Sequence, residues 1–160
     1  MGREIRRVPK GWEHPRDEKG NYRRLFDWSY ATAARKWLDD CIAWDNGTAG
    51  ELQKDPGLKE KYPFFWDYDG APPDPEYCRP DWAEEATCYQ VYETVSEGTP
   101  TSPVFETEFQ MIDWLVGQGH SPHAAEEFVK AGWAPSFMVI PGVGMAKNMD
   151  AFDFLPSRDG

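Results

Sequence analysis

The sequence predicts an α+β fold, with a single compact domain that holds one N-terminal helix, a small antiparallel sheet and a helical hairpin. A chain of 160 residues is long enough for one domain with a substantial buried core. Apolar residues recur at helical spacing near residues 30–44, 109–116 and 124–129, and they alternate over 87–95. Aromatic residues make up 15% of the chain, which is more than disordered proteins carry.

We expect three regions along the chain. Residues 1–24 form a basic, extended N-terminal segment. Trp12 anchors it, and the prolines and glycines of residues 8–24 interrupt any regular element there. Residues 25–150 form the α+β domain, and residues 151–160 form a C-terminal tail.

The N-terminal helix is predicted to begin after Asp27 or Ser29, whose side-chain oxygens accept hydrogen bonds from the free N–H groups of a first turn. It ends at Asn46 and Gly47, a pair typical of helix C-termini. Its apolar face is expected to pack into the core and comprises Tyr30, Ala33, Ala34, Trp37, Leu38, Cys41 and Trp44.

Two segments carry the pattern of strands. Residues 87–95 are rich in β-branched and aromatic side chains, which favour a strand with Cys88, Gln90, Tyr92 and Thr94 on one face. Residues 136–140 and 143–145 are predicted to form a hairpin, because Pro141 and Gly142 favour a turn between them.

Two short helices are predicted between these strands. Thr107 and Gln110 form a capping box before an apolar stripe. Ser121 and Pro122 open the second helix as N-cap and first helical residue. The residues expected to be buried on these helices are Phe109, Ile112, Leu115, Val116, Ala124, Ala125, Phe128 and Val129.

The net charge of −11 is unevenly distributed. Residues 1–24 hold eight Lys or Arg against four Asp or Glu, a net charge of +4. The remaining residues hold nine against 24, a net charge of −15. A region with this much negative charge repels nucleic acid and attracts basic partners. We therefore expect no direct nucleic-acid binding. Solubility alone is the other explanation for this charge.

Acidic and aromatic residues gather in the stretch that begins at Tyr62. The proline-rich run at residues 71–77 is expected to cross the surface as polyproline-like coil. Interleaved acids and aromatic rings favour a surface that binds a basic protein. The candidate partner-binding residues are Asp67, Asp69, Asp74, Glu76, Asp81, Trp82, Glu84 and Glu85.

A zinc site, in a metal-binding domain or a metal-dependent enzyme, is the alternative. Zinc sites use four cysteine or histidine ligands, usually with two cysteines a few residues apart. The candidate ligands are Cys78, Cys88, His120 and His123. The step between the two cysteines is too long for a zinc knuckle, so we expect no metal and no cofactor. We also expect no catalytic residue, because the sequence carries no catalytic signature.

Four stretches resemble a family of small, uncharacterised proteins encoded in bacteriophage and prophage genomes: residues 3–15, 92–100, 102–105 and 131–136. The resemblance implies a phage accessory protein in the cytoplasm of a bacterial host, and it supplies no catalytic residue. Small acidic phage proteins include inhibitors of host defence, among them anti-CRISPR proteins and DNA mimics.

The predicted function is therefore non-enzymatic binding and inhibition of a host protein, of a kind that itself binds nucleic acid. A virion or assembly component is a further alternative. No membrane partner is expected, because no run of about 18 apolar residues occurs and the first residues lack the apolar stretch of a signal peptide.

Overall fold

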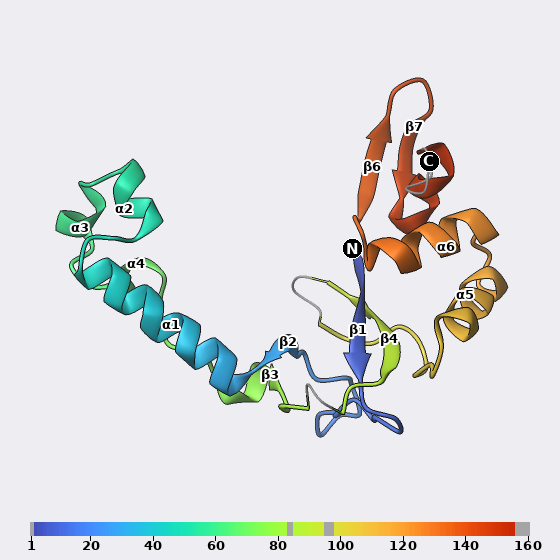
Figure 1. Cartoon of the computed structure of the whole chain (residues 1–160), viewed down its shortest axis with the longest axis horizontal. Helices are drawn as coiled ribbons and strands as arrows, with labels where there is room; N and C mark the ends of the chain where they lie inside the picture. Colours follow the sequence, from blue (N-terminus) through green and yellow to red (C-terminus); the bar gives the residue numbers. More distant parts are fainter. Residues whose placement is uncertain (1, 83–84, 95–97, 156–160) are drawn as a thin grey trace. The chain divides into compact units, whose positions relative to one another are not determined.

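The computed structural model describes residues 2–82, 85–94 and 98–155. It divides the chain into two compact units. We call Met1–Leu25 with Trp82–Gly160 the sheet unit, and Phe26–Asp81 the helical unit. Helices and small, mostly antiparallel sheets occur together, which confirms the predicted α+β class (Figure 1).

The sheet unit is built on three antiparallel strands in the order β4-β1-β5. They are β1 (Arg3–Val8), β4 (Cys88–Glu93) and β5 (Trp133–Ala134). The pairing of β1 with β4 runs from Arg3 opposite Glu93 to Val8 opposite Cys88. The predicted strand at 87–95 is confirmed as β4, and Val95 lies outside the described residues.

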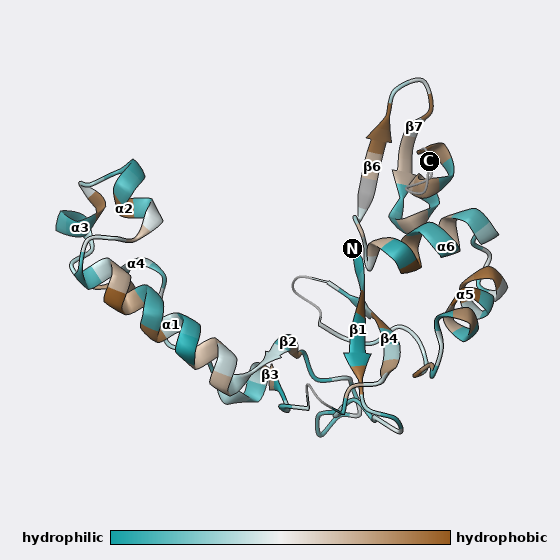
Figure 2. Cartoon of the chain, viewed as in Figure 1, coloured by the Kyte–Doolittle hydropathy of each residue, from teal (hydrophilic) through white to brown (hydrophobic). Residues whose placement is uncertain are grey.

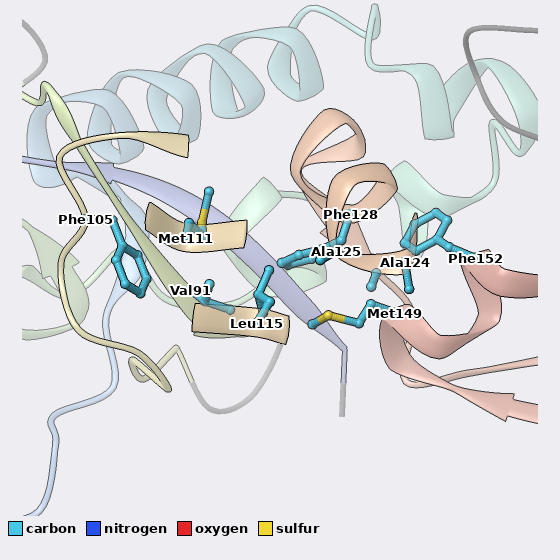
Figure 3. Packing of buried hydrophobic residues seen from close by; sticks show 10 residues of the cluster. Val91, Phe105, Met111, Leu115, Ala124, Ala125, Phe128, Met149 and Phe152 are labelled. Atoms are coloured by element: carbon cyan, nitrogen blue, oxygen red, sulfur yellow. The ribbon is translucent and has the colours of Figure 1, made fainter. Parts of the chain in front are cut away.

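Two helices cover one face of this sheet. The predicted caps are confirmed: Thr107 and Gln110 form the capping box of α5 (Glu108–Gly117), and Ser121 caps α6 (Pro122–Ala131). A core cluster joins both helices to β4 and to the 3₁₀ helix η2 (Asn148–Phe154), and Figure 3 shows most of it. Its members are Val91, Phe105, Met111, Leu115, Ala124, Ala125, Phe128, Ala134, Met149 and Phe152.

The predicted buried stripe of α5 is wrong in two positions, because Phe109 and Val116 are both exposed. Phe109 is 80% exposed, whereas Met111 and Leu115 are fully buried. Phe109 and Met111 are two residues apart, about 200° around a helix, so they cannot face the same core. The face of α5 that packs into the core is the one that carries Met111 and Leu115.

The other face of the sheet is covered mainly by residues that follow β1 or precede β4 in the chain. Val8, Cys88 and Tyr92 pack with Trp82 in a second core cluster. Trp12 lies against this cluster, with its ring centroid 4.3 Å from that of Trp82, and its Nε1 donates to the Tyr92 hydroxyl at 3.2 Å. Both sheet faces are therefore buried, which explains why β4 is apolar or neutral on both sides from Cys88 to Tyr92, before Glu93 at its end.

The C-terminal residues form the predicted hairpin and then pack back on the core. Strands β6 (Phe137–Ile140) and β7 (Gly144–Lys147) pair antiparallel, with Ile140 opposite Gly144. Met149 and Phe152 of η2 are buried against α6.

The helical unit begins with β2 (Phe26–Ser29) and the long helix α1 (Tyr30–Asp45). The predicted cap is confirmed, because the Ser29 side chain accepts from the Thr32 N–H. Short elements follow, which are α2 (Gly50–Lys54), α3 (Leu58–Lys61), α4 (Phe65–Tyr68), the 3₁₀ helix η1 (Pro75–Tyr77) and β3 (Cys78–Arg79). Strand β3 pairs parallel with β2, and Arg79 donates to Asp27 at 2.8 Å.

The apolar face of α1 is less buried than expected. Trp44 is the buried residue of this helix, and it packs with Ala49, Leu52 and Phe65. Tyr30 and Leu38 are exposed, which corrects their assignment to the core. Figure 2 shows hydrophobic and hydrophilic residues interleaved along α1. The other residues of the predicted face are partly buried: Ala33, Ala34, Trp37 and Cys41.

No helix among residues 2–82, 85–94 and 98–155 has the length and apolar character needed to cross a membrane.

Candidate functional site

A groove of about 550 Å³ lies in the helical unit. Its walls are aromatic: Phe26 and Trp28 come from β2, Trp37 from α1 and Tyr77 from η1. Phe26 and Trp28 lie two residues apart, so their side chains share one side of β2. Their rings stack with centroids 4.7 Å apart and an interplanar angle of 11°. Pairing of β2 with β3 brings Tyr77 and Cys78 to the same groove.

Three carboxylates and one ammonium group line the groove beside these rings. Asp40 and Lys36 lie one turn apart on α1, and Lys36 Nζ contacts Asp40 Oδ2 at 2.6 Å. The hydrogen bond and charge of Asp40 raise the pKa of Lys36, and the charge of Asp69 acts in the same direction. Lys36 balances one carboxylate, and Asp69 and Asp74 leave the groove with two net negative charges.

The backbone holds Asp69 and Asp74 in place. Asp69 follows the last residue of α4, and its N–H donates to the Phe65 carbonyl at 2.8 Å. Asp74 caps η1, because its Oδ1 accepts from the Glu76 N–H at 2.9 Å. The Cys78 thiol donates to the Asp74 carbonyl at 3.5 Å. Two loop carboxylates are thereby presented on short, hydrogen-bonded turns.

The structure separates the candidate partner-binding residues into two groups. Asp67, Asp69, Asp74, Glu76 and Asp81 are exposed in the helical unit, and Asp69 and Asp74 line the groove. Glu85 is exposed in the sheet unit, and Glu84 lies outside the described residues.

Trp82 differs from the other candidates, because it is buried in the sheet unit. Its Nε1 donates to the Arg7 carbonyl at 3.4 Å. Its side chain therefore belongs to the core and is not available to a partner in this conformation, which corrects its place among the binding residues.

The half of the groove that β2 and α1 supply is not indicated by the sequence. Phe26, Trp28, Thr32, Ala33, Lys36 and Asp40 precede the acidic-aromatic stretch by many residues. The spacing of Lys36 and Asp40 predicts an ion pair on a helix surface. No local signal indicates that this pair faces Asp69, because their proximity depends on the packing of the unit.

A smaller groove of about 340 Å³ lies between α1 and the segment before and within α4. Phe64 and Trp66 line it, and their rings stack with centroids 4.6 Å apart. Both are about half exposed, as is Ile42 of α1. Aromatic side chains are thus presented to solvent on a second part of the helical unit.

The proposed zinc ligands are not brought together. Among the described residues, no three His, Cys, Asp or Glu side chains form a group that could hold a metal ion. Cys88 is buried against Val8 and Trp82, whereas Cys78 belongs to the helical unit. His120 Nδ1 lies 2.8 Å from Asp150 Oδ1, and His123 is exposed on α6.

The sheet unit has a hollow of about 860 Å³ beside its N-terminal segment, lined by Trp12, His14, Arg16 and Gln90 among others. The His14 ring bridges the Tyr92 hydroxyl, 2.9 Å from Nδ1, and the Arg23 carbonyl at Nε2. Burial lowers the pKa of His14 below its ordinary value, although the bond to the Arg23 carbonyl acts in the opposite direction. A neutral ring satisfies both contacts: Nε2–H donates to the carbonyl and Nδ1 accepts from the tyrosine.

The chemistry of the groove in the helical unit favours cations. Aromatic faces attract cations through their quadrupole, and carboxylates add charge and hydrogen-bond acceptors.

Comparisons with family models, curated proteins and solved structures found no match to the chain. The function is therefore inferred from the chemistry of the groove itself.

Proposed function

We propose that the chain is a non-enzymatic binding protein that docks a basic segment of another protein on its helical unit. The partner is a bacterial host protein that binds nucleic acid, and docking inhibits it. In this proposal the chain is a phage-encoded accessory protein of the anti-defence class, such as an anti-CRISPR protein or a DNA mimic.

The observation that carries the proposal is the aromatic groove lined by Asp69 and Asp74. Exposed aromatic rings such as Trp28, at 43% exposure, supply contact area at low entropic cost. The two carboxylates beside them select for positive charge and accelerate encounter with a basic surface.

The charge of the whole chain supports a partner that binds nucleic acid. The net charge of −11 repels nucleic acid itself. Proteins that bind nucleic acid carry basic surfaces, because they neutralise phosphates with lysine and arginine. A carboxylate-rich face can compete with phosphates for the same surface.

Capture from bacterial lysate tests the proposal, with the full-length chain as bait. The variant Asp69→Lys/Asp74→Asn reverses one groove charge and removes the other, and asparagine retains the ability to cap η1. A matched control, Glu60→Lys/Glu126→Gln, makes the same change in net charge at exposed positions outside the groove.

We expect the full-length chain to capture a nucleic-acid-binding protein, and that protein to lose its nucleic acid in the complex. The control variant should capture it equally well. Capture by the groove variant should fall about tenfold or more, since two charge contacts of roughly 1 kcal/mol each are lost. Equal capture by both variants, or a partner that keeps its nucleic acid, would contradict the proposal.

A further inference from the structure

We infer that the groove of the helical unit selects arginine over lysine, so that the docked segment presents a guanidinium group between the aromatic walls and the carboxylates. This inference rests on the proposed function and specifies the side chain that the groove receives.

The walls of the groove favour a weakly hydrated, planar cation. Phe26, Trp28, Trp37 and Tyr77 line it together with Ala33, Ala71 and Pro73. An ammonium group is compact and strongly hydrated, and it loses much of its water shell in such surroundings. A guanidinium group is more weakly hydrated, and it can stack on an aromatic face while its edge donates hydrogen bonds.

The carboxylates are placed to receive that edge. Asp40 is already engaged by Lys36 at 2.6 Å, which leaves the charges of Asp69 and Asp74 uncompensated within the groove lining. A guanidinium group has five N–H donors in a rigid fork that matches carboxylate geometry, whereas an ammonium group is a point charge. Two carboxylates near aromatic walls therefore distinguish the two cations.

The chain's own cations show the same preference. The Lys36 side chain lines the groove but is 77% exposed, so its ammonium group stays in water beside Asp40. Elsewhere in the chain, the Arg16 guanidinium lies 3.8 Å from the Tyr22 ring centroid, and that of Arg6 lies 4.3 Å from Tyr92. The Lys61 ammonium lies farther from the ring of its neighbour Tyr62, at 5.2 Å from the centroid.

The test is the affinity of the full-length chain for two labelled peptides, measured by fluorescence anisotropy at several salt concentrations. The peptides have the same length and charge, and one carries arginine where the other carries lysine. We expect the arginine peptide to bind about tenfold more tightly, and more so at high salt, because stacking is screened less than charge.

Three variants locate the preference. Trp28→Ala should reduce arginine binding to about the level of lysine binding, because it removes an exposed wall of the groove. Asp69→Asn should weaken both peptides. Phe64→Ala is the matched control, because it removes an aromatic ring of similar exposure from the smaller groove, and it should leave both affinities unchanged. Circular dichroism confirms that each variant keeps its helix content.

The outcomes separate this inference from the proposed function. Equal affinity for both peptides, lost in Asp69→Asn, overturns arginine selection and leaves a groove for basic segments in general. An arginine preference that persists in Trp28→Ala also overturns the inference, because the selection then comes from elsewhere. If neither peptide binds at low salt, both the inference and the proposed function fail.

Discussion

Replacing Trp44 with phenylalanine should destabilise the helical unit and remove its binding groove indirectly. Trp44 is fully buried, and its Nε1 donates to the Tyr62 carbonyl at 2.9 Å. Its ring stacks on Tyr68 with centroids 4.8 Å apart and packs against Phe65. It therefore holds α1, which carries Trp37 of the groove, against the segment that leads to Asp69.

The expected cost has two parts. Phenylalanine cannot donate to Tyr62, and a buried acceptor without a partner costs about 1–3 kcal/mol; we take the lower half of this range because the bond is only part-buried. The smaller ring leaves a small cavity, which costs about 1 kcal/mol more. The total of about 2–3 kcal/mol is large for this unit, because its core cluster contains four buried residues: Trp44, Ala49, Leu52 and Phe65.

Urea unfolding followed by far-UV circular dichroism measures this change in the full-length chain. Amide hydrogen exchange over residues 30–45 then assigns the loss to α1. The control is Trp28→Phe, which makes the same substitution at an exposed position and should change stability by less than about 0.5 kcal/mol. If Trp44→Phe costs no more than the control, or if α1 keeps its protection, the assignment of Trp44 as the anchor of this unit is refuted.

Two further predictions concern the sheet unit. Gly98→Ala should cost about 2–4 kcal/mol, because a Cβ there would lie 2.4 Å from the Leu25 carbonyl oxygen at a φ of +54°. The control is Gly20→Ala, where φ is also positive but the added Cβ meets open space, and it should cost only about 1 kcal/mol. Similar melting temperatures for the two variants would contradict the close approach of Gly98 to the Leu25 carbonyl. The pKa of His14 is lower in the folded chain than its ordinary value of 6.5 in the unfolded chain. As the pH falls below about 6.5, the unfolded chain therefore takes up a proton before the folded chain does, and the free energy of unfolding should fall. His14→Gln should flatten this pH dependence in urea titrations, and an unchanged slope would count against a buried, neutral His14.

Local signals predicted the elements well and burial less well. Ser29, Thr107 and Ser121 cap helices as expected, because a cap needs only the few residues around it. Phe109 and Tyr30 are exposed although both lie on apolar helix faces, because burial depends on which element packs there. The short helices α2, α3 and α4 were not predicted, since each spans only four or five residues and lacks a side-chain cap.

The candidate site was predicted only in its acidic half. Acids and aromatic rings close together in the chain indicated a binding surface around Asp69 and Asp74, and the structure leaves both exposed. Trp82 lies in the same stretch but is buried in the other unit. Composition identifies residues that share a chemistry, but not the side of the backbone on which each one lies.

The sequence by itself determined the α+β class, the helix caps, the strand at Cys88–Glu93 and the acidic character of the surface. Each of these depends on neighbouring residues or on composition. Only the tertiary structure decided that β1 pairs with β4 and that Trp28 of β2 shares a groove with Asp74. These contacts join residues far apart in the chain, and they form because the burial of apolar surface compensates the entropy of closing long loops.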